Sequence, residues 1–241
     1  MQRTYDFSVA DSGDRPADIL LPRQTPCLRR LVKLGGAAIT NKSRIETLNK
    51  VSLEHCAKAL ADAISYDKSE EKDNIPVGQH GGTAVVHGAG SFGHHQASEG
   101  KVASGGLELE SVRKGFLKTR LSVTKLQHFV VESLVEEGVE AVGISPLGKW
   151  TTADRQLLSV WSGDFEAVLG AGFVPVLHGD CVLDESTGCT ILSGDTIMSH
   201  LARKWRPDIV VFLTDVDGVF SRPPGSEGAR LLSTIRVSDD G

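Results

Sequence analysis

A run of small and apolar residues, TAVVHGAGSFGHH at positions 83–95, constrains the fold of this chain more than any other stretch. Its first half is rich in β-branched residues and predicts a buried strand. Its second half is a glycine-rich turn, whose backbone N–H groups can approach an anion closely because glycine has no Cβ. A strand that enters such a turn at the start of a helix is typical of a phosphate site. A sharp strand-to-helix turn with His94 and His95 at the surface explains the same pattern.

Composition narrows the class of protein. A chain of 241 residues is long enough for one large α/β domain, or for two lobes that share a sheet. Its 31 acidic and 26 basic residues give a mild negative charge without a basic stripe, which argues against nucleic acid as a partner. No apolar run approaches the roughly 18 to 20 residues needed to cross a bilayer, so we expect a soluble protein without a membrane partner. The four cysteines form no CxxC pair, which favours free thiols in a reducing compartment.

Apolar runs that predict strands alternate with helical patterns along most of the chain. Strands are expected at 31–34, 83–87, 139–144, 173–177 and 208–213, and helices at 51–64, 107–137, 164–169 and 195–202. A hairpin is expected from 181–184 and 189–192. This alternation predicts an α/β fold, a three-layer sandwich with a mostly parallel central sheet and ligands at the carboxyl ends of its strands.

Three other segments lack such patterns. Residues 1–27 show little periodicity and predict a mobile N-terminal extension that need not belong to the fold. Residues 65–82 are charged and glycine-rich, so we expect a loop. Residues 97–106 are small and polar, which predicts a flexible segment able to close over a ligand.

Polar residues at three predicted strand ends form candidate sites. Lys33 and Lys42 flank a double-glycine turn, which suits two phosphate groups held close together. Lys33 lies inside an apolar strand, where an unpaired ammonium is costly to bury. Asp195 follows Ser193, a natural N-cap, and fits a partner for such a lysine, although helix capping explains its position as well.

Several other binding motifs fail in detail. Gly88, Gly90 and Gly93 fit the dinucleotide fingerprint, but the acidic residue expected at the end of a second strand is absent. Asp215 and Asp217 resemble the start of a calcium loop that lacks its closing glutamate. The chain has no GxxxxGKS motif and no nucleophilic serine or cysteine with a recognisable base.

Four ordered motifs resemble the amino acid kinase superfamily, and specifically its isopentenyl phosphate kinase branch. They are VKLGGAAITNK, HGAGSFGHH, a hairpin followed by SGD, and LTDVDGVF, and the match covers about residues 28–224. The histidine of SFGH points to phosphorylated isoprenoids as the acceptor. The resemblance implies an ATP-dependent kinase that converts isopentenyl phosphate into isopentenyl diphosphate, as a homodimer in the cytosol, with Mg²⁺ carried by the ATP phosphates.

The resemblance also implies roles for individual residues. The implied catalytic residues are Lys33, Lys42 for transition-state stabilisation, His94, and Asp195, which orients the lysines. The implied ATP contacts are Lys33, Gly35, Gly36, Ala37, Ala89, Asp215 and Phe220, the last in place of a tyrosine. The implied acceptor contacts are Gly88, Gly93, His94 and Gly194. No residue is implied as a metal ligand.

The C-terminal part departs from the family pattern. Members continue through a further glycine-containing loop and a lysine near the nucleotide, so the resemblance implies a truncated chain. Its expected division is an acceptor-binding lobe at about 28–180 and an incomplete nucleotide-binding lobe at about 181–241. The alternatives are another small phosphate or phosphonate kinase of the superfamily, such as a fosfomycin-type kinase, and a catalytically impaired phosphate-binding subunit.

Overall fold

A central sheet of five parallel strands organises the computed structural model, which describes residues 26–70 and 81–236. The strand order is β3-β6-β2-β1-β9. Their bounds are β1 Leu28–Leu34, β2 Gly82–His87, β3 Ala141–Gly143, β6 Val174–His178 and β9 Ile209–Leu213. β1 lies between β2 and β9, with Lys33 in register with Val86 on one side and Phe212 on the other. The predicted parallel sheet is therefore confirmed.

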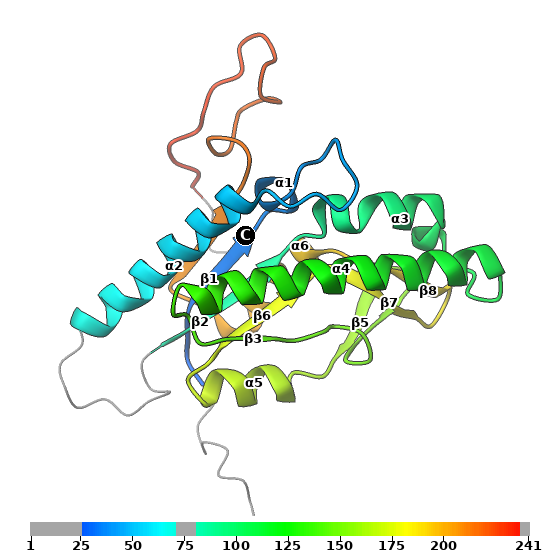
Figure 1. Ribbon diagram of the computed structural model, residues 1–241, viewed down its shortest axis with the longest axis horizontal. Helices are drawn as coiled ribbons and strands as arrows, with labels where there is room; N and C mark the ends of the chain where they lie inside the picture. The colour runs from blue at the N-terminus through cyan, green and yellow to red at the C-terminus, as the bar shows by residue number, and fades with distance from the viewer. Residues whose placement is uncertain (1–25, 71–80, 237–241) are drawn as a thin grey trace, which may run out of the picture.

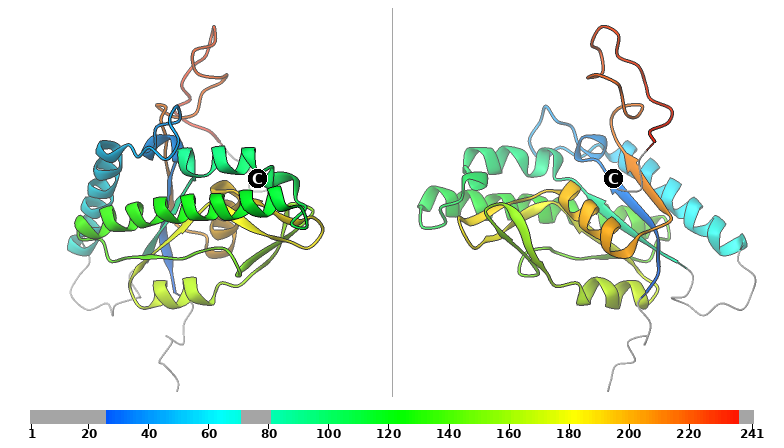
Figure 2. Two further views of the ribbon diagram at one scale, coloured as in Figure 1. Left: turned by 45° about the vertical axis from the view of Figure 1, so that its right-hand side comes forward. Right: turned by 180° about the vertical axis from the view of Figure 1, so that it is seen from behind.

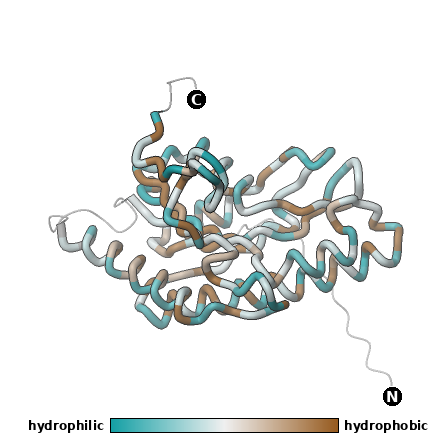
Figure 3. Tube along the Cα trace, turned by 90° about the horizontal axis from the view of Figure 1, so that it is seen from above, coloured by the Kyte–Doolittle hydropathy of each residue, from teal (hydrophilic) through white to brown (hydrophobic). Residues whose placement is uncertain are grey.

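Helices cover both faces of this sheet (Figures 1 and 2). α2 (Lys50–Glu70) and α4 (Glu110–Glu136) pack on one face, whereas α5 (Gly163–Gly170) and α6 (Gly194–Trp205) pack on the other. Val32 and Val85 point to the first pair of helices and Leu31 and Ala84 to the second, so β1 and β2 carry apolar residues on both sides. The long helices alternate hydrophilic and hydrophobic residues, because only one side of each faces the sheet (Figure 3).

A second, mixed sheet of four strands extends the fold in the order β5-β4-β7-β8. Their bounds are β4 Trp150–Ala153, β5 Gln156–Val160, β7 Asp180–Asp184 and β8 Gly188–Leu192. The β7–β8 hairpin was expected and is confirmed. The antiparallel pair β4–β5 was not expected, because its two-residue turn is built from Asp154 and Arg155, both with positive φ, instead of glycine or asparagine.

Two predicted segments differ from the structure. The loop expected from Ser65 is wrong for residues 65–70, because α2 continues to Glu70, and Asp67 on that last part accepts a hydrogen bond of 2.7 Å from Arg30 of β1. Residues 97–106, expected to be flexible, contain the end of α3 (His94–Glu99) and a 3₁₀ turn, Val102–Ser104. Val102 is fully buried beside the free thiols of Cys181 and Cys189 and fixes this segment to β7 and β8.

The remaining expectations concern the ends of the chain. The predicted N-terminal extension lies outside the described residues, apart from positions 26 and 27, and the predicted loop at 71–80 lies outside them as well. After β9, residues 214–236 project from the body in all three ribbon views (Figures 1 and 2). No helix within the described ranges is long and apolar enough to span a membrane.

Candidate phosphate-binding site

A pocket of about 510 Å³ opens where β1, β2 and β6 reach their carboxyl ends. This is the position at which parallel α/β sheets bind ligands. Ten of the residues to which the resemblance assigns roles line it, although they come from separate loops: Lys33, Gly36, Ala37, Lys42, Gly88, Ala89, Gly93, His94, Gly194 and Asp195. The fold thus gathers three loops with the backbone and side-chain chemistry of an anion site into one cavity.

Two glycine turns form the floor of the pocket and touch backbone to backbone. A Cβ placed on Gly36 would lie 2.4 Å from the nitrogen of Gly90, and one on Gly88 would lie 2.8 Å from the nitrogen of Gly36. Thr40 locks the contact, because its hydroxyl donates to the Gly36 carbonyl at 2.7 Å and accepts from the Ser91 N–H at 3.0 Å. Glycine is therefore required at these positions for steric reasons, whether or not its backbone also contacts a ligand.

Lys33 is held at the pocket by an ion pair. Its ammonium contacts Asp195 at the start of α6, where the side chain of Ser193 accepts the Thr196 N–H at 3.0 Å as an N-cap. The Lys33 side chain is 16% exposed and that of Asp195 is 72% exposed, so the carboxylate stays hydrated while it compensates a largely buried cation. The ammonium also lies 5.8 Å from the centroid of the Phe212 ring.

Lys42 has a different partner. Its ammonium lies 2.8 Å from the carboxylate of Asp215, which follows β9, and the hydrogen bond with Lys42 lowers the pKa of Asp215. The resemblance implied that Asp195 orients both lysines, whereas here each lysine pairs with its own carboxylate. Both partners of the second pair are partly exposed, so Lys42 remains able to reorient toward an anion.

Three of the expected nucleotide contacts lie outside the pocket lining. The N–H of Gly35 donates to the Leu213 carbonyl at 2.8 Å and joins β1 to β9. Asp215 reaches the site only through Lys42. Phe220 belongs to the projecting segment, where it forms a bridge with Leu231.

His94 and His95 open α3 directly after Gly93 and both line the pocket. A Cβ on Gly93 would meet Ala89 at 2.7 Å and Val123 at 2.8 Å, so this glycine lets the turn pack against α4. The packing directs the start of α3, with its two imidazoles, toward the same cavity as the lysines.

One wall of the pocket is apolar, and its individual residues were not identified from the sequence. It comprises Ala97 of α3, Thr119 and Val123 of α4, and Ile191 and Leu192 of β8. Residues that face a pocket and residues that face the core share one apolar pattern on a helix, so periodicity alone does not separate them. The cavity therefore has one polar side and one apolar side.

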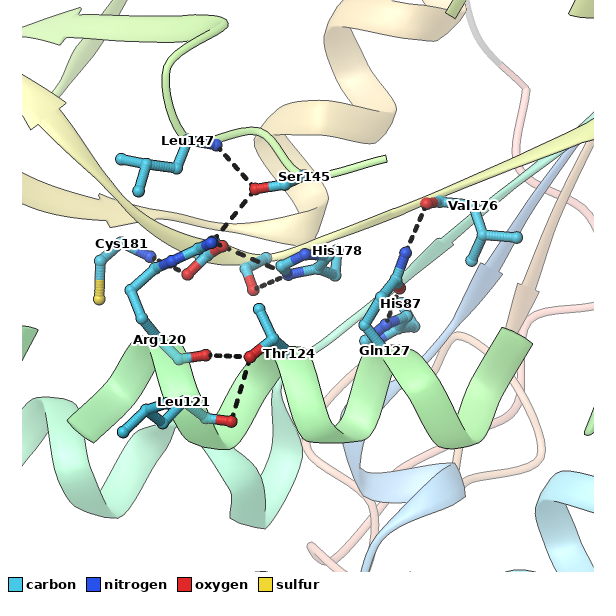
Figure 4. Close-up of polar contacts among 12 residues, drawn as sticks. His87, Arg120, Leu121, Thr124, Gln127, Ser145, Leu147, Val176, His178 and Cys181 are labelled. Atoms are coloured by element: carbon cyan, nitrogen blue, oxygen red, sulfur yellow. Dashed lines mark hydrogen bonds and ion pairs between the residues drawn. The ribbon is translucent and has the colours of Figure 1, made fainter. Parts of the chain in front are cut away.

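Two buried histidines lie behind the floor. His87 and His178 are in register on β2 and β6 and stack with ring centroids 5.5 Å apart. Gln127 of α4 contacts both strands, with Oε1 2.6 Å from Nε2 of His87 and Nε2 donating to the Val176 carbonyl at 2.7 Å (Figure 4). Burial lowers the pKa of His87, and burial together with His87 lowers the pKa of His178 to about 3. Both rings are neutral at physiological pH.

We expect the free energy of unfolding to fall as the pH drops below 6.5. His178 stays neutral in the folded protein down to a pKa of about 3, whereas the unfolded chain binds this proton near pH 6.5. Between these values the unfolded state holds more protons, so acid favours unfolding, and the loss from this group is about 2 kcal/mol by pH 5. Urea unfolding at about pH 7.5 and about pH 5 measures the difference.

A matched pair of variants isolates the contribution of this ring. His178→Gln should remove about one proton from the pH dependence, and His128→Gln, at an exposed position on α4, is the matched control. An equal pH dependence in the wild type and His178→Gln would show that His178 does not titrate on unfolding.

Known proteins resemble this chain in sequence and in structure. The model of the amino acid kinase family matches residues 29–240. Isopentenyl phosphate kinase from Arabidopsis thaliana is 43% identical over 239 residues, which cover 89% of this chain and 72% of the relative. The enzyme of that name from Methanothermobacter thermautotrophicus is 33% identical over 224 residues, covering 87% and 76%.

Solved structures agree with this assignment. A crystal structure of isopentenyl phosphate kinase superposes with a TM-score of 0.76 at 32% identity, covering 87% of this chain and 81% of that one. UMP kinase from Bacillus anthracis superposes with a TM-score of 0.52 at 19% identity, which shows a common fold and no more. The chain belongs to the amino acid kinase family, in its isopentenyl phosphate kinase branch.

Proposed function

We propose that this chain transfers the γ-phosphoryl group of ATP to isopentenyl phosphate and releases isopentenyl diphosphate and ADP. The observation that carries the proposal is the convergence of Lys33, Lys42 and His94 on one pocket floored by two glycine turns. The apolar wall supports an acceptor with a hydrocarbon tail, because it offers such a tail a surface away from water. The relatives named above are isopentenyl phosphate kinases.

The reaction needs charge neutralisation more than proton transfer. An oxygen of the acceptor phosphate forms a bond to the γ-phosphorus as the bond from that phosphorus to the bridging oxygen of ADP breaks. The attacking oxygen is already anionic, so no general base is required. Lys33, Lys42 and the backbone N–H groups of the glycine turns supply fixed positive potential where the two polyanions meet.

The two halves of the pocket take different substrates in this proposal. Gly36 and Ala37, beside Lys33, hold the ATP phosphates, while Gly88, Gly93, His94 and Gly194 hold the acceptor phosphate. Asp215 serves the nucleotide side by positioning Lys42, from which it lies 2.8 Å away. Residues at about 28–180 then supply most of the acceptor contacts, and the part from about 181 onward adds Gly194 to the acceptor side and Asp215 to the nucleotide side.

Mg²⁺ enters the proposal as the partner of the ATP phosphates, whose negative charge it neutralises. No three His, Cys, Asp or Glu side chains gather at one point in the described part of the chain, and Asp195 and Asp215 are each paired with a lysine. The carboxylates of the site therefore fit lysine partners better than a protein-held metal. A homodimer in the cytoplasm completes the proposal and rests on the family resemblance.

The proposal is tested by ADP release with isopentenyl phosphate, fosfomycin and UMP as acceptors, in wild type and in His94→Ala. We expect wild type to favour isopentenyl phosphate by roughly a hundredfold in kcat/KM. His94→Ala should raise the acceptor KM or lower kcat strongly and leave the KM for ATP near normal, because His94 lies on the acceptor side. His128→Ala, at an exposed position of α4, is the matched control.

Three results would each contradict part of this proposal. Preference for fosfomycin would identify a phosphonate kinase. Calorimetric binding of isopentenyl phosphate without any ADP release would identify a phosphate-binding protein. Unchanged turnover in His94→Ala would remove the basis for placing the acceptor phosphate beside this ring.

A further inference from the structure

A buried carboxylate lies behind the wall of the proposed acceptor pocket. Asp180 is the first residue of β7, and its side chain has no exposed surface. One oxygen accepts the Cys181 N–H at 2.7 Å, and the other pairs with the guanidinium of Arg120 from α4. Arg120 also donates to the hydroxyl of Ser145 at 3.2 Å, and Figure 4 shows it pointing from α4 toward Ser145.

This ion pair joins two walls of the pocket. Gly179 and Asp180 line the cavity on the sheet side, and Thr119 and Val123 line it on α4, on either side of Arg120 in the sequence. The Arg120 side chain is 21% exposed, so the pair is shielded from water on most sides. A charge at this place acts on the pocket through protein and is only weakly screened by solvent.

Arg120 is the charged partner of Asp180 among the described residues. His178 lies 3.6 Å from the carboxylate, but burial and the neighbouring His87 lower its pKa to about 3, so the ring is neutral. Burial raises the pKa of the neighbouring Cys181 thiol to about 12, so this group is neutral as well. Without Arg120, a bare negative charge would remain beside a cavity that holds phosphate.

We propose that Arg120 is a positioning residue for the acceptor phosphate, which cancels the charge of Asp180 and holds the 179–180 turn against α4. The proposal rests on the proposed function for the identity of the acceptor. Buried ion pairs add little to stability compared with apolar replacements, whereas loss of one partner leaves an uncompensated buried charge. Loss of the Arg120 charge should therefore weaken binding of the anionic acceptor, and loss of the Asp180 charge should not.

Kinetics of single and double variants test this sign. Arg120→Met keeps an unbranched apolar stem, removes the guanidinium and exposes the pocket to the Asp180 charge, so we expect the acceptor KM to rise about tenfold or more. Asp180→Asn removes the negative charge and should not raise this KM. The double variant Arg120→Met/Asp180→Asn should recover most of the loss, and Arg120→Lys should recover part of it. Arg113→Met, exposed on the same helix, is the matched control.

If the ion pair between Arg120 and Asp180 only stabilises the fold, the variants should show a different pattern of acceptor KM values. If both single variants raise the acceptor KM equally and the double variant is no better, the charge-compensation proposal is wrong. If urea titrations show that Arg120→Met is not folded, Arg120→Lys and the double variant are compared with wild type instead. Wild type that does not phosphorylate isopentenyl phosphate would refute the proposed function alone. Calorimetric binding of inorganic diphosphate to the same proteins would still test the order expected here.

Discussion

Replacing Lys33 by methionine is expected to lower kcat by about a thousandfold while the protein remains folded. Methionine keeps an unbranched apolar stem inside β1 but removes the ammonium at the pocket, which in the proposed reaction stabilises the transferred phosphoryl group. The Asp195 side chain, which loses its partner in this variant, is 72% exposed. Water can therefore solvate its carboxylate, and the free energy of unfolding should fall only slightly. Initial rates at saturating ATP and acceptor measure kcat, and urea unfolding checks stability.

Lys118→Met, at an exposed position on α4 outside the pocket lining, is the control for loss of a positive charge. A Lys33→Met enzyme within about tenfold of wild-type kcat would show that this ammonium does not stabilise the transition state. Lys33→Met that also unfolds easily would instead assign the pair with Asp195 mainly to the stability of the contact between β1 and α6.

The second large effect is expected from Gly36→Ala. The new methyl group would lie 2.4 Å from the nitrogen and 2.7 Å from the Cα of Gly90, and backbone atoms cannot rotate away as a side chain would. The two glycine turns must therefore separate, which breaks the floor of the pocket where we propose that ATP and acceptor meet. We expect kcat/KM to fall at least about a hundredfold and the free energy of unfolding to fall by about 1–3 kcal/mol.

Gly138→Ala separates this contact from ordinary backbone strain. Gly138 has φ +83°, but no atom lies within 4 Å of an added Cβ, so strain is the main effect there. Its variant should lose about 1 kcal/mol of stability and keep full turnover. Near-normal turnover in Gly36→Ala would mean that the two turns tolerate separation and that their contact does not shape the site.

Much of the fold is predictable because buried parallel strands carry continuous apolar runs. β2 and β6 are buried almost throughout, and β1 carries buried apolar residues on both faces alongside Arg29, Arg30 and Lys33, so the apolar positions identify all three as strands. β4 and β5 were not predicted, because the turn between them is formed by Asp154 and Arg155, which adopt left-handed conformations that the surrounding sheet imposes. The C-terminal end of α2 was not predicted either, because a charged helix surface has the same composition as a loop.

The site divides in the same way. Glycine turns and lysines at strand ends carry their chemistry in the local sequence, and the pocket gathers most of them. The expected partner of Lys33, Asp195, is confirmed, but the other charged pairs have no local signal: Lys42 meets Asp215, and Arg120 meets Asp180, across 173 and 60 positions. Such contacts depend on how strands are ordered in the sheet, which a local pattern does not encode.

The strand order of the central sheet also has a consequence during translation. β1 is made early, yet its neighbour on one side is β9, Ile209–Leu213. At about 5 to 20 residues per second, the ribosome needs on the order of ten seconds or more to deliver that partner. Until then β1 exposes a free apolar edge that can pair with other nascent chains. Cellular yield of this protein should therefore depend on chaperones that shield strand edges co-translationally.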